Sequence, residues 1–207
     1  MSNTYLAKRG YVIKKSSLSD EEIEEVKREL TVQPAVSADY GAVPDPFPVF
    51  LENAKKLYLP KFYGIEKFGE AKENKVPAGD DIDVEFKFSI RPNQEEPVKK
   101  CMEAYKKVGG GILSLGCGQG KTIIGLHLIS RLKKKTLVIV HKEFLLNQWI
   151  ERIEQALPDA RVGRIQQSTY DVDDKDIVIG MLQTISMKDF SLLLIAFDCF
   201  LTAFDCF

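Results

Sequence analysis

The chain has 207 residues, of which 44% are hydrophobic and 29% charged, and its formal net charge is −1. These values place it in the soluble globular class, with room for one large or two small domains. The near-neutral charge excludes a globally basic nucleic-acid binder, so any basic surface must be local. The four cysteines show neither C-x-x-C pairs nor regular spacing, which argues against a zinc site and a disulfide framework (Cys101, Cys117, Cys199 and Cys206).

Residues 1–82 predict a small α+β module. Lys8-Arg9 is followed by alternating residues and not by an apolar block, so a signal peptide is not expected and an intracellular location follows. Ser19-Asp20-Glu21-Glu22 is a capping box that opens a helix. Two strands are expected at 49–51 and 57–59 with a polar turn between them. The polar stretch 70–83 is typical of a linker.

Residues 84–189 predict a second domain in which strands and helices alternate. The alternating pattern at 84–90 predicts a half-buried strand, and Pro92 is a good first residue for a helix. The further elements expected in chain order are a strand at 112–115, a helix at 123–132, a strand at 136–140, a helix at 144–153 and strands at 161–165 and 176–181. This order predicts an α/β fold with a parallel sheet covered by helices on both faces.

A glycine-rich loop stands between the strand expected at 112–115 and the following helix. Its sequence from Gly116 to Thr122 is G-C-G-Q-G-K-T. Such glycines let backbone N–H groups converge on phosphate oxygens at a helix N-terminus, where the dipole favours anions. Lys121 would reach the outer phosphates and the Thr122 hydroxyl would ligate magnesium. The strict G-x-x-x-x-G-K-[ST] pattern fails because Leu115 replaces the first glycine, and the alternative is an ordinary glycine turn before a helix.

Three groups of polar residues are expected at the carboxyl ends of strands, where ligands bind in parallel sheets. They are the phosphate loop, His141-Lys142 and Gln183-Thr184. His141 and Lys142 have a second interpretation, in which they simply cap the next helix.

Four segments, in order and spacing, resemble the first half of the first RecA-like domain of superfamily 2 DNA helicases and translocases. The resemblance covers residues 90–189. Within the family, these residues are most similar to the branch that includes XPB, UvsW and the helicases of poxviruses and related large DNA viruses. Ile90-Arg91-Pro92-Asn93-Gln94 resembles the L-R-P-x-Q element, and Leu115–Thr122 resembles motif I, in which the first glycine is also missing. Segment 137–142 with Gln148-Trp149 resembles motif Ia, and 177–185 resembles the strand-contacting turn that follows.

The resemblance implies cofactors, partners and roles for particular residues. ATP with Mg²⁺ would be bound, with adenine contacted by Arg91 and Gln94. Lys121 and Thr122 would be catalytic, with Thr122 on magnesium. The phosphate-binding set would be Leu115, Gly116, Cys117, Gly118, Gln119, Gly120, Lys121 and Thr122. Nucleic acid, DNA in preference to RNA, would be contacted by His141, Lys142, Gln183 and Thr184. The protein is expected to be intracellular, in the cytoplasm or nucleus, and a viral gene is one origin that the resemblance implies.

Segment 57–64 also resembles the viral and phage branch, in a region that would contact duplex DNA. Its aromatic residues alternate with Lys55, Lys56 and Lys61, which suits phosphate binding and base stacking. The alternative is that these aromatic residues form the core of the small module.

Residues 190–207 depart from the helicase pattern. No D-E-x-H or D-E-A-D box occurs, and Cys199 follows Asp198 where the catalytic Glu would stand. We therefore expect a truncated or frameshifted motor, inactive alone, without the second RecA-like domain and without a membrane span. A P-loop phosphotransferase and a non-catalytic nucleotide- or DNA-binding module are the alternatives.

Overall fold

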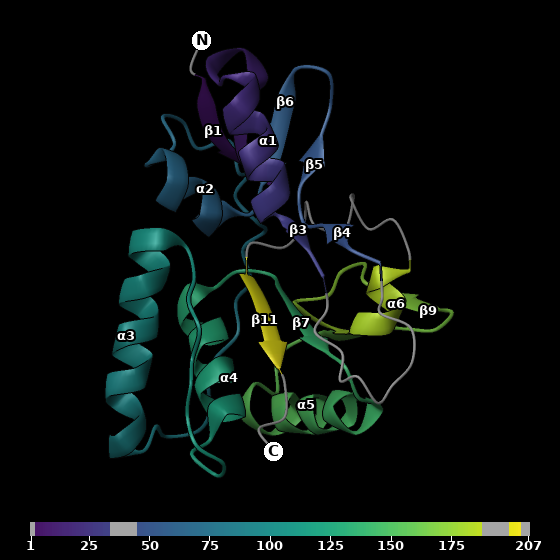
Figure 1. The fold of residues 1–207 in the computed structure, drawn as a ribbon. Coiled ribbons are helices and arrows are strands. Elements are labelled where there is room, and N and C mark those ends of the chain that lie inside the picture. The colour runs from purple at the N-terminus through teal and green to yellow at the C-terminus, as the bar shows by residue number, and fades with distance from the viewer. Residues whose placement is uncertain (1–2, 34–44, 188–198, 204–207) are drawn as a thin grey trace. The chain divides into compact units, whose positions relative to one another are not determined.

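The computed structural model describes residues 3–33, 45–187 and 199–203, the last of these by its backbone. The chain divides into two compact units, Met1–Pro77 and Ala78–Phe207 (Figure 1). Each unit has its own sheet and its own hydrophobic core. Within the described ranges, no helix combines the length and the apolar character that a membrane crossing requires.

The N-terminal unit is built on a four-stranded antiparallel sheet with the order β1-β2-β6-β5. Its strands are β1 (Thr4–Ala7), β2 (Gly10–Lys14), β5 (Leu51–Glu52) and β6 (Lys56–Leu59). A 3-10 turn (Lys15–Ser17) and helices α1 (Asp20–Glu29) and α2 (Lys61–Phe68) accompany it, with a small ribbon of β3 (Thr31–Val32) and β4 (Phe47–Pro48). Strands β1 and β2 and helix α2 were not among the predicted elements.

The predicted capping box is confirmed at the start of α1. The Ser19 hydroxyl accepts a hydrogen bond from the Glu22 N–H at 3.2 Å, and the Glu22 carboxylate accepts one from the Ser19 N–H at 2.7 Å. Two of the four N–H groups that a helix start leaves unpaired are thereby bonded. The apolar stripe of α1 then packs Val26 and Leu30 against the sheet residues of the core, which are Tyr11, Ile13, Leu57 and Leu59.

The predicted hairpin between 49–51 and 57–59 is confirmed with different bounds: β5 is shorter and begins at Leu51, and β6 begins one residue earlier, at Lys56. Leu51 pairs with Tyr58 and Glu52 with Leu57. Val49 lies outside β5 because its N–H bonds to the carbonyl of Leu30 at 2.8 Å.

The C-terminal unit is built on a five-stranded sheet with the order β11-β7-β10-β8-β9. Its strands are β7 (Thr136–Val140), β8 (Val162–Gln166), β9 (Thr169–Asp171), β10 (Ile177–Met181) and β11 (Cys199–Ala203). The helices are α3 (Pro92–Val108), α4 (Lys121–Leu132), α5 (Glu143–Ala156) and the short α6 (Leu182–Ser186). Strands β11, β7, β10 and β8 pair parallel with one another, and β9 pairs antiparallel with β8, which confirms an α/β fold with a partly parallel sheet.

Both faces of this sheet are covered in the described residues. One face of β7 and β10 packs against α4 and α5, where the buried residues include Val138, Ile179, Leu126, Leu146 and Ile153. On the other face Leu137, Val178 and Ile165 pack with Val172 and with Ile185 of α6. Alternate residues of one strand therefore serve two separate cores, as expected for a doubly covered sheet.

Two predicted strands do not form. Residues 84–90 bury Val84, but the backbone in and just before this stretch bonds to helix ends. The Lys87 N–H donates to the Ala156 carbonyl, and the Ile82 N–H donates to the Lys133 carbonyl. Residues 112–115 lie outside the sheet, and Ile112 is 97% exposed. Neither segment can pair with β7, because both edges of that strand are occupied, by β10 and by β11.

Asp198, which precedes the position where the catalytic Glu would stand, lies outside the described residues, as do residues 204–207. The strand that does form in this region starts one residue later, at Cys199.

Candidate nucleotide-binding site

The glycine-rich loop connects the end of α3 to the start of α4. Gly109 ends α3 with φ +73°, and Gly118 and Gly120 have φ +73° and +79°. These are left-handed conformations that glycine adopts without strain. Gly120 is the N-cap of α4, so the loop delivers the chain directly to the unpaired N–H groups of a helix N-terminus.

Gln94 joins the first turn of α3 to this loop. Its side chain is buried, with the residue 2% exposed. The amide nitrogen Nε2 donates to the carbonyl of Gln119 at 3.0 Å, and Oε1 accepts from the Arg91 N–H at 3.0 Å. The Gln94 N–H in turn donates to the Arg91 carbonyl at 2.8 Å. Both ends of the buried amide are thus satisfied, and they connect two segments that sequence reasoning placed in one site.

The contact between Gln94 and the loop leaves no room for a side chain at Gly120. A Cβ built on Gly120 would lie 2.3 Å from Gln94 Nε2. A Cβ on Gly118 would meet no heavy atom within 4 Å, so this part of the loop borders open space. The two glycines therefore differ: both need the left-handed backbone, and Gly120 alone also needs the close approach.

Lys121 begins α4 and reaches back over the loop. Its Nζ donates to the carbonyls of Leu115 and Gly116, each at 3.1 Å. Thr122 follows on the same helix turn. All eight residues predicted to bind phosphates thus lie in one loop and its adjoining helix turn, although no sheet strand precedes them.

A broad cavity of about 2090 Å³ lies between this loop and helices α3, α4 and α5. A nucleotide fits easily, because ligand pockets typically measure roughly 300–1,000 Å³. Arg91, Gln94, Lys121 and Thr122 line it. So do Tyr105 of α3 and Arg152 of α5, which sequence reasoning missed; the helical spacing of Gln148 and Arg152 was the signal that could have found Arg152.

Two titratable side chains of α3 and α4 are held neutral by their surroundings. Burial raises the pKa of the Cys101 thiol, which lines the cavity. Burial, followed by the nearby Arg131 charge, lowers the pKa of His127. The His127 ring lies 4.9 Å from the Phe86 ring, edge to face, so His127 is a half-buried packing residue. Trp149, 5% exposed, belongs to the core.

The other two predicted groups meet each other at the sheet edge. β7 and β10 are adjacent and in register up to Val140 and Met181, so the residues after each strand lie side by side. Gln183 Nε2 donates to the His141 carbonyl at 2.9 Å, and Thr184 Oγ1 accepts from the Gln167 N–H at 3.0 Å.

These residues do not line the cavity beside the glycine-rich loop. Lys142 is the N-cap residue of α5, without a side-chain capping hydrogen bond. The structure therefore separates the predicted site into a loop region and a strand-end region.

Fold and loop together define a RecA-like α/β domain of the superfamily 2 helicase kind. The model of the family described as type III restriction enzyme, res subunit, matches residues 87–201, more than half of the chain. The chain belongs to this family, and it is related to viral helicases and to XPB translocases.

Three similar proteins illustrate the relationship. A candidate ATP-dependent RNA helicase of Acanthamoeba polyphaga mimivirus is 32% identical over 205 residues, which cover 93% of this chain and 39% of that protein. The DNA 3'-5' translocase XPB2 of Sulfurisphaera tokodaii is 36% identical over 95 residues, 46% of this chain and 21% of that protein. The Sulfolobus solfataricus SWI2/SNF2 ATPase core in complex with dsDNA has a TM-score of 0.50 and 22% identity, covering 59% of this chain and 27% of that chain.

The last of these similarities concerns the fold alone. The chain spans about two fifths or less of each curated relative named above.

Proposed function

We propose that the chain binds ATP through residues 115–122 and forms the nucleotide-binding part of a DNA translocase. The observation that supports this best is the hydrogen bond from buried Gln94 to Gln119, across 25 residues of sequence. This hydrogen bond joins the Arg91–Gln94 element to the glycine-rich loop. A nucleotide site needs such proximity, because the first segment would contact the base and the second the phosphates of the same molecule.

The phosphates would bind where Lys121 and the α4 N-terminus converge. The Lys121 ammonium is bonded to two neutral carbonyls. A phosphate oxygen carries more negative charge and forms a stronger, charge-assisted hydrogen bond, so exchange of partners favours binding. The open space beside Gly118 leaves the loop backbone accessible to such a group.

Magnesium would arrive with the nucleotide. In the described ranges, no group of three or more His, Cys, Asp or Glu side chains forms a site that could hold a metal ion. The Thr122 hydroxyl is a hard oxygen ligand of the kind Mg²⁺ prefers, and phosphate oxygens supply further ligands. Magnesium would neutralise phosphate charge when it is bound there.

Arg91 and Gln94 would divide the recognition of the base. Arg91 is exposed at the cavity, whereas Gln94 is 2% exposed and already bonded at both ends. We therefore assign base contact chiefly to Arg91 and positioning of the loop to Gln94.

Hydrolysis and movement need more than this site. Water activation requires a carboxylate of the kind a D-E-x-H box carries, and that sequence does not occur in the 207 residues. We propose that this chain binds ATP without turning it over, and that a second RecA-like domain would close over the nucleotide in a working motor. DNA would contact His141, Lys142, Gln183 and Thr184 at the ends of β7 and β10, and the protein would act in the cytoplasm or nucleus.

The test is equilibrium binding of a fluorescent ATP analogue with Mg²⁺ to the 207-residue chain. Lys121→Ala should weaken binding at least about tenfold, because it removes the charge-assisted bond. Lys107→Ala, at an exposed lysine near the end of α3, is the matched control and should leave the affinity unchanged. Equal affinities for wild type and Lys121→Ala would refute nucleotide binding at this loop. DNA-stimulated phosphate release by this chain would refute the absence of hydrolysis.

A further inference from the structure

The sheet of the N-terminal unit has two unlike faces. One face packs against α1 and α2 through Tyr11, Ile13, Leu57 and Leu59. The residues that alternate with these point to the opposite face. There Tyr5, Val12 and Tyr58 form one row across β1, β2 and β6, since Val12 pairs with both tyrosines. Adjacent strands are about 4.8 Å apart, so the two tyrosine backbones lie about 10 Å from each other.

The two tyrosine rings are partly exposed and held in position. Val12 between them is 0% exposed, while Tyr5 and Tyr58 keep part of their surface in solvent. Lys56 Nζ donates to the Tyr5 hydroxyl at 3.0 Å, and Asn53 Nδ2 donates to the Tyr58 hydroxyl at 3.1 Å. Each ring is therefore anchored at its polar end, which lowers the entropy lost when a flat ligand stacks on it.

Cations surround both rings. Lys75 Nζ lies 4.6 Å and Lys56 Nζ 5.4 Å from the centre of the Tyr5 ring, and the Arg9 guanidinium lies 5.5 Å from that of Tyr58. A flexible cation on a ring face can move aside for a base and then meet the phosphate beside that base. The hydrogen bond to Tyr5 raises the pKa of Lys56, which keeps the amine charged.

Two lysines on this face stand directly opposite each other. Lys14 pairs with Lys56 across β2 and β6. Like charges in directly opposed positions destabilise a sheet. An anionic ligand would turn this repulsion into attraction for both lysines.

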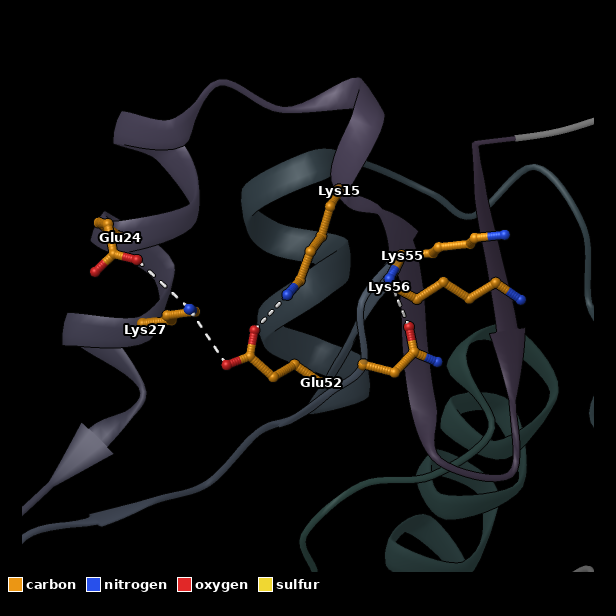
Figure 2. Close-up of polar contacts among 7 residues, drawn as sticks. Lys15, Glu24, Lys27, Glu52, Lys55 and Lys56 are labelled. Carbon is orange, nitrogen blue, oxygen red and sulfur yellow. Dashed lines mark hydrogen bonds and ion pairs between the residues drawn. The ribbon is translucent and has the colours of Figure 1, made fainter.

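One cation of this face already has a carboxylate partner, because Lys75 forms an ion pair with Glu73 at 2.8 Å. The other neighbouring carboxylate, that of Glu52, is directed to the opposite face. Glu52 pairs with Leu57, which belongs to the helix-covered core, and it forms ion pairs with Lys15 and Lys27. Figure 2 shows Glu52 between these two lysines, while Lys55 and Lys56 extend in the other direction. Throughout the described parts of the chain, no ion pair joins Arg9, Lys14 or Lys56 to a carboxylate.

We infer that this tyrosine face, formed by Tyr5, Arg9, Lys14, Lys56, Tyr58 and Lys75, binds single-stranded nucleic acid. Unpaired bases stack on the two rings, and the cations hold the phosphates between and beside them. Paired bases in a duplex do not expose their faces, so the surface prefers single strands. The inference rests on the proposed function in that the polymer is a nucleic acid, but it requires neither ATP nor the glycine-rich loop.

The first test is fluorescence anisotropy of a labelled oligothymidylate with the 207-residue chain in the absence of ATP. Tyr5→Leu and Tyr58→Leu keep an apolar cover over Val12 but remove the stacking ring, and each should weaken binding at least about fivefold. Tyr5→Phe keeps the ring and should retain most of the affinity. Phe62→Leu is the aromatic control, because Phe62 is 54% exposed on α2. Loss of binding in Phe62→Leu but not in the tyrosine variants would overturn the inference.

The second test uses Lys14→Glu, which changes the charge of the face without removing a packed side chain. It replaces a repulsive cross-strand pair with an attractive one, so the midpoint of thermal unfolding should rise while oligonucleotide affinity falls. The slope of log affinity against log salt should lose about 0.7 or more in magnitude. Arg28→Ala, at an exposed position on α1, is the charge control. Unchanged affinity in Lys14→Glu, or equal affinity for duplex DNA, would contradict the inference.

Failure of the two proposals can be told apart. Lys121→Ala should leave oligothymidylate binding in the absence of ATP unchanged. If the chain does not bind ATP but the tyrosine variants bind the oligonucleotide more weakly than wild type, the tyrosine face is supported and the nucleotide site is refuted. If ATP binding depends on Lys121 but the tyrosine variants bind like wild type, the face is refuted and the nucleotide site stands.

Discussion

The Gln94 side chain donates a 3.0 Å hydrogen bond to the carbonyl oxygen of Gln119, one residue before the N-cap of α4. The geometry of the glycine-rich loop is therefore set from α3. The segment just before the loop, 112–115, has no strand partner in the described residues and cannot fix the loop by sheet pairing.

Gln94→Ala should weaken ATP-analogue binding about tenfold and lower the free energy of unfolding by about 1–3 kcal/mol. The substitution removes the hydrogen bonds of Gln94 to the Gln119 carbonyl and to the Arg91 N–H, and each such bond contributes a net of about 0.5–1.5 kcal/mol. Titration calorimetry and urea denaturation measure the two effects. Gln155→Ala, in which an exposed glutamine bonds only to Arg152, is the control and should alter neither. Unchanged binding in Gln94→Ala would show that the loop is held by other contacts.

Gly120→Ala should be clearly more harmful than Gly118→Ala. Both substitutions place a Cβ on a left-handed backbone, at a cost of about 1 kcal/mol. Only at Gly120 does the new Cβ also fall 2.3 Å from Gln94 Nε2. Denaturation of the two variants and of the double variant Gly120→Ala/Gln94→Ala measures the coupling, because shortening Gln94 removes the clash. Equal effects of the two single variants would argue against the close approach at Gly120.

Asp176→Asn should reduce stability at neutral pH by about 2 kcal/mol, because it weakens charged hydrogen bonds at a buried carboxylate. Asp176 accepts from the Arg161 guanidinium at 2.7 and 3.0 Å and from the Arg161 N–H at 2.8 Å. Burial alone raises the pKa of Asp176, but these bonds outweigh burial and leave the pKa lowered.

The pH dependence of this pair follows from the sign of that shift. A carboxyl whose pKa is lowered by folding stabilises the protein above the unfolded-state pKa, near 3.8, and loses that contribution as the pH falls through the folded-state value. The difference between wild type and Asp176→Asn should therefore shrink as urea denaturation is repeated at pH 7, 4 and 3. Asp173→Asn, at an exposed position, should follow wild type throughout. A difference that stays constant with pH would mean that the pair is not the acid-sensitive element.

His127→Leu should keep or raise stability, by up to about 1 kcal/mol at neutral pH. Among the described side chains, His127 Nδ1 is one of the few buried polar atoms without a hydrogen-bond partner. Its pKa is lowered by burial and by Arg131, so below about pH 6.5 the unfolded state takes up a proton first and folding becomes less favourable. As the pH is lowered from 7.5 to 5, the midpoint of thermal unfolding should fall less steeply for His127→Leu than for wild type. A steeper fall in the variant would contradict this assignment.

The elements predicted best from sequence were those with a local signal. The capping box at Ser19–Glu22, the apolar run at 136–140 and the helix that ends at Leu132 all appear where the pattern placed them. Each depends on contacts within a few residues or on one buried face, and the local pattern of polar and apolar residues shows both. His141 and Gln183 were also placed correctly after the carboxyl ends of strands, and the structure adds that these two strands, β7 and β10, are neighbours.

The sequence by itself thus determined the α/β class, the glycine-rich loop and the residues that compose it. Tertiary structure decided that 112–115 would lie outside the sheet and that β7 would pair with β10 and β11, because strand pairing joins segments that are far apart in the sequence. It also decided that Gln94 would be buried under the loop and that Tyr5 and Tyr58 would share one sheet face across β2. Such relationships join residues about 25 to 50 positions apart. They follow from strand register and helix packing, and no local pattern encodes them.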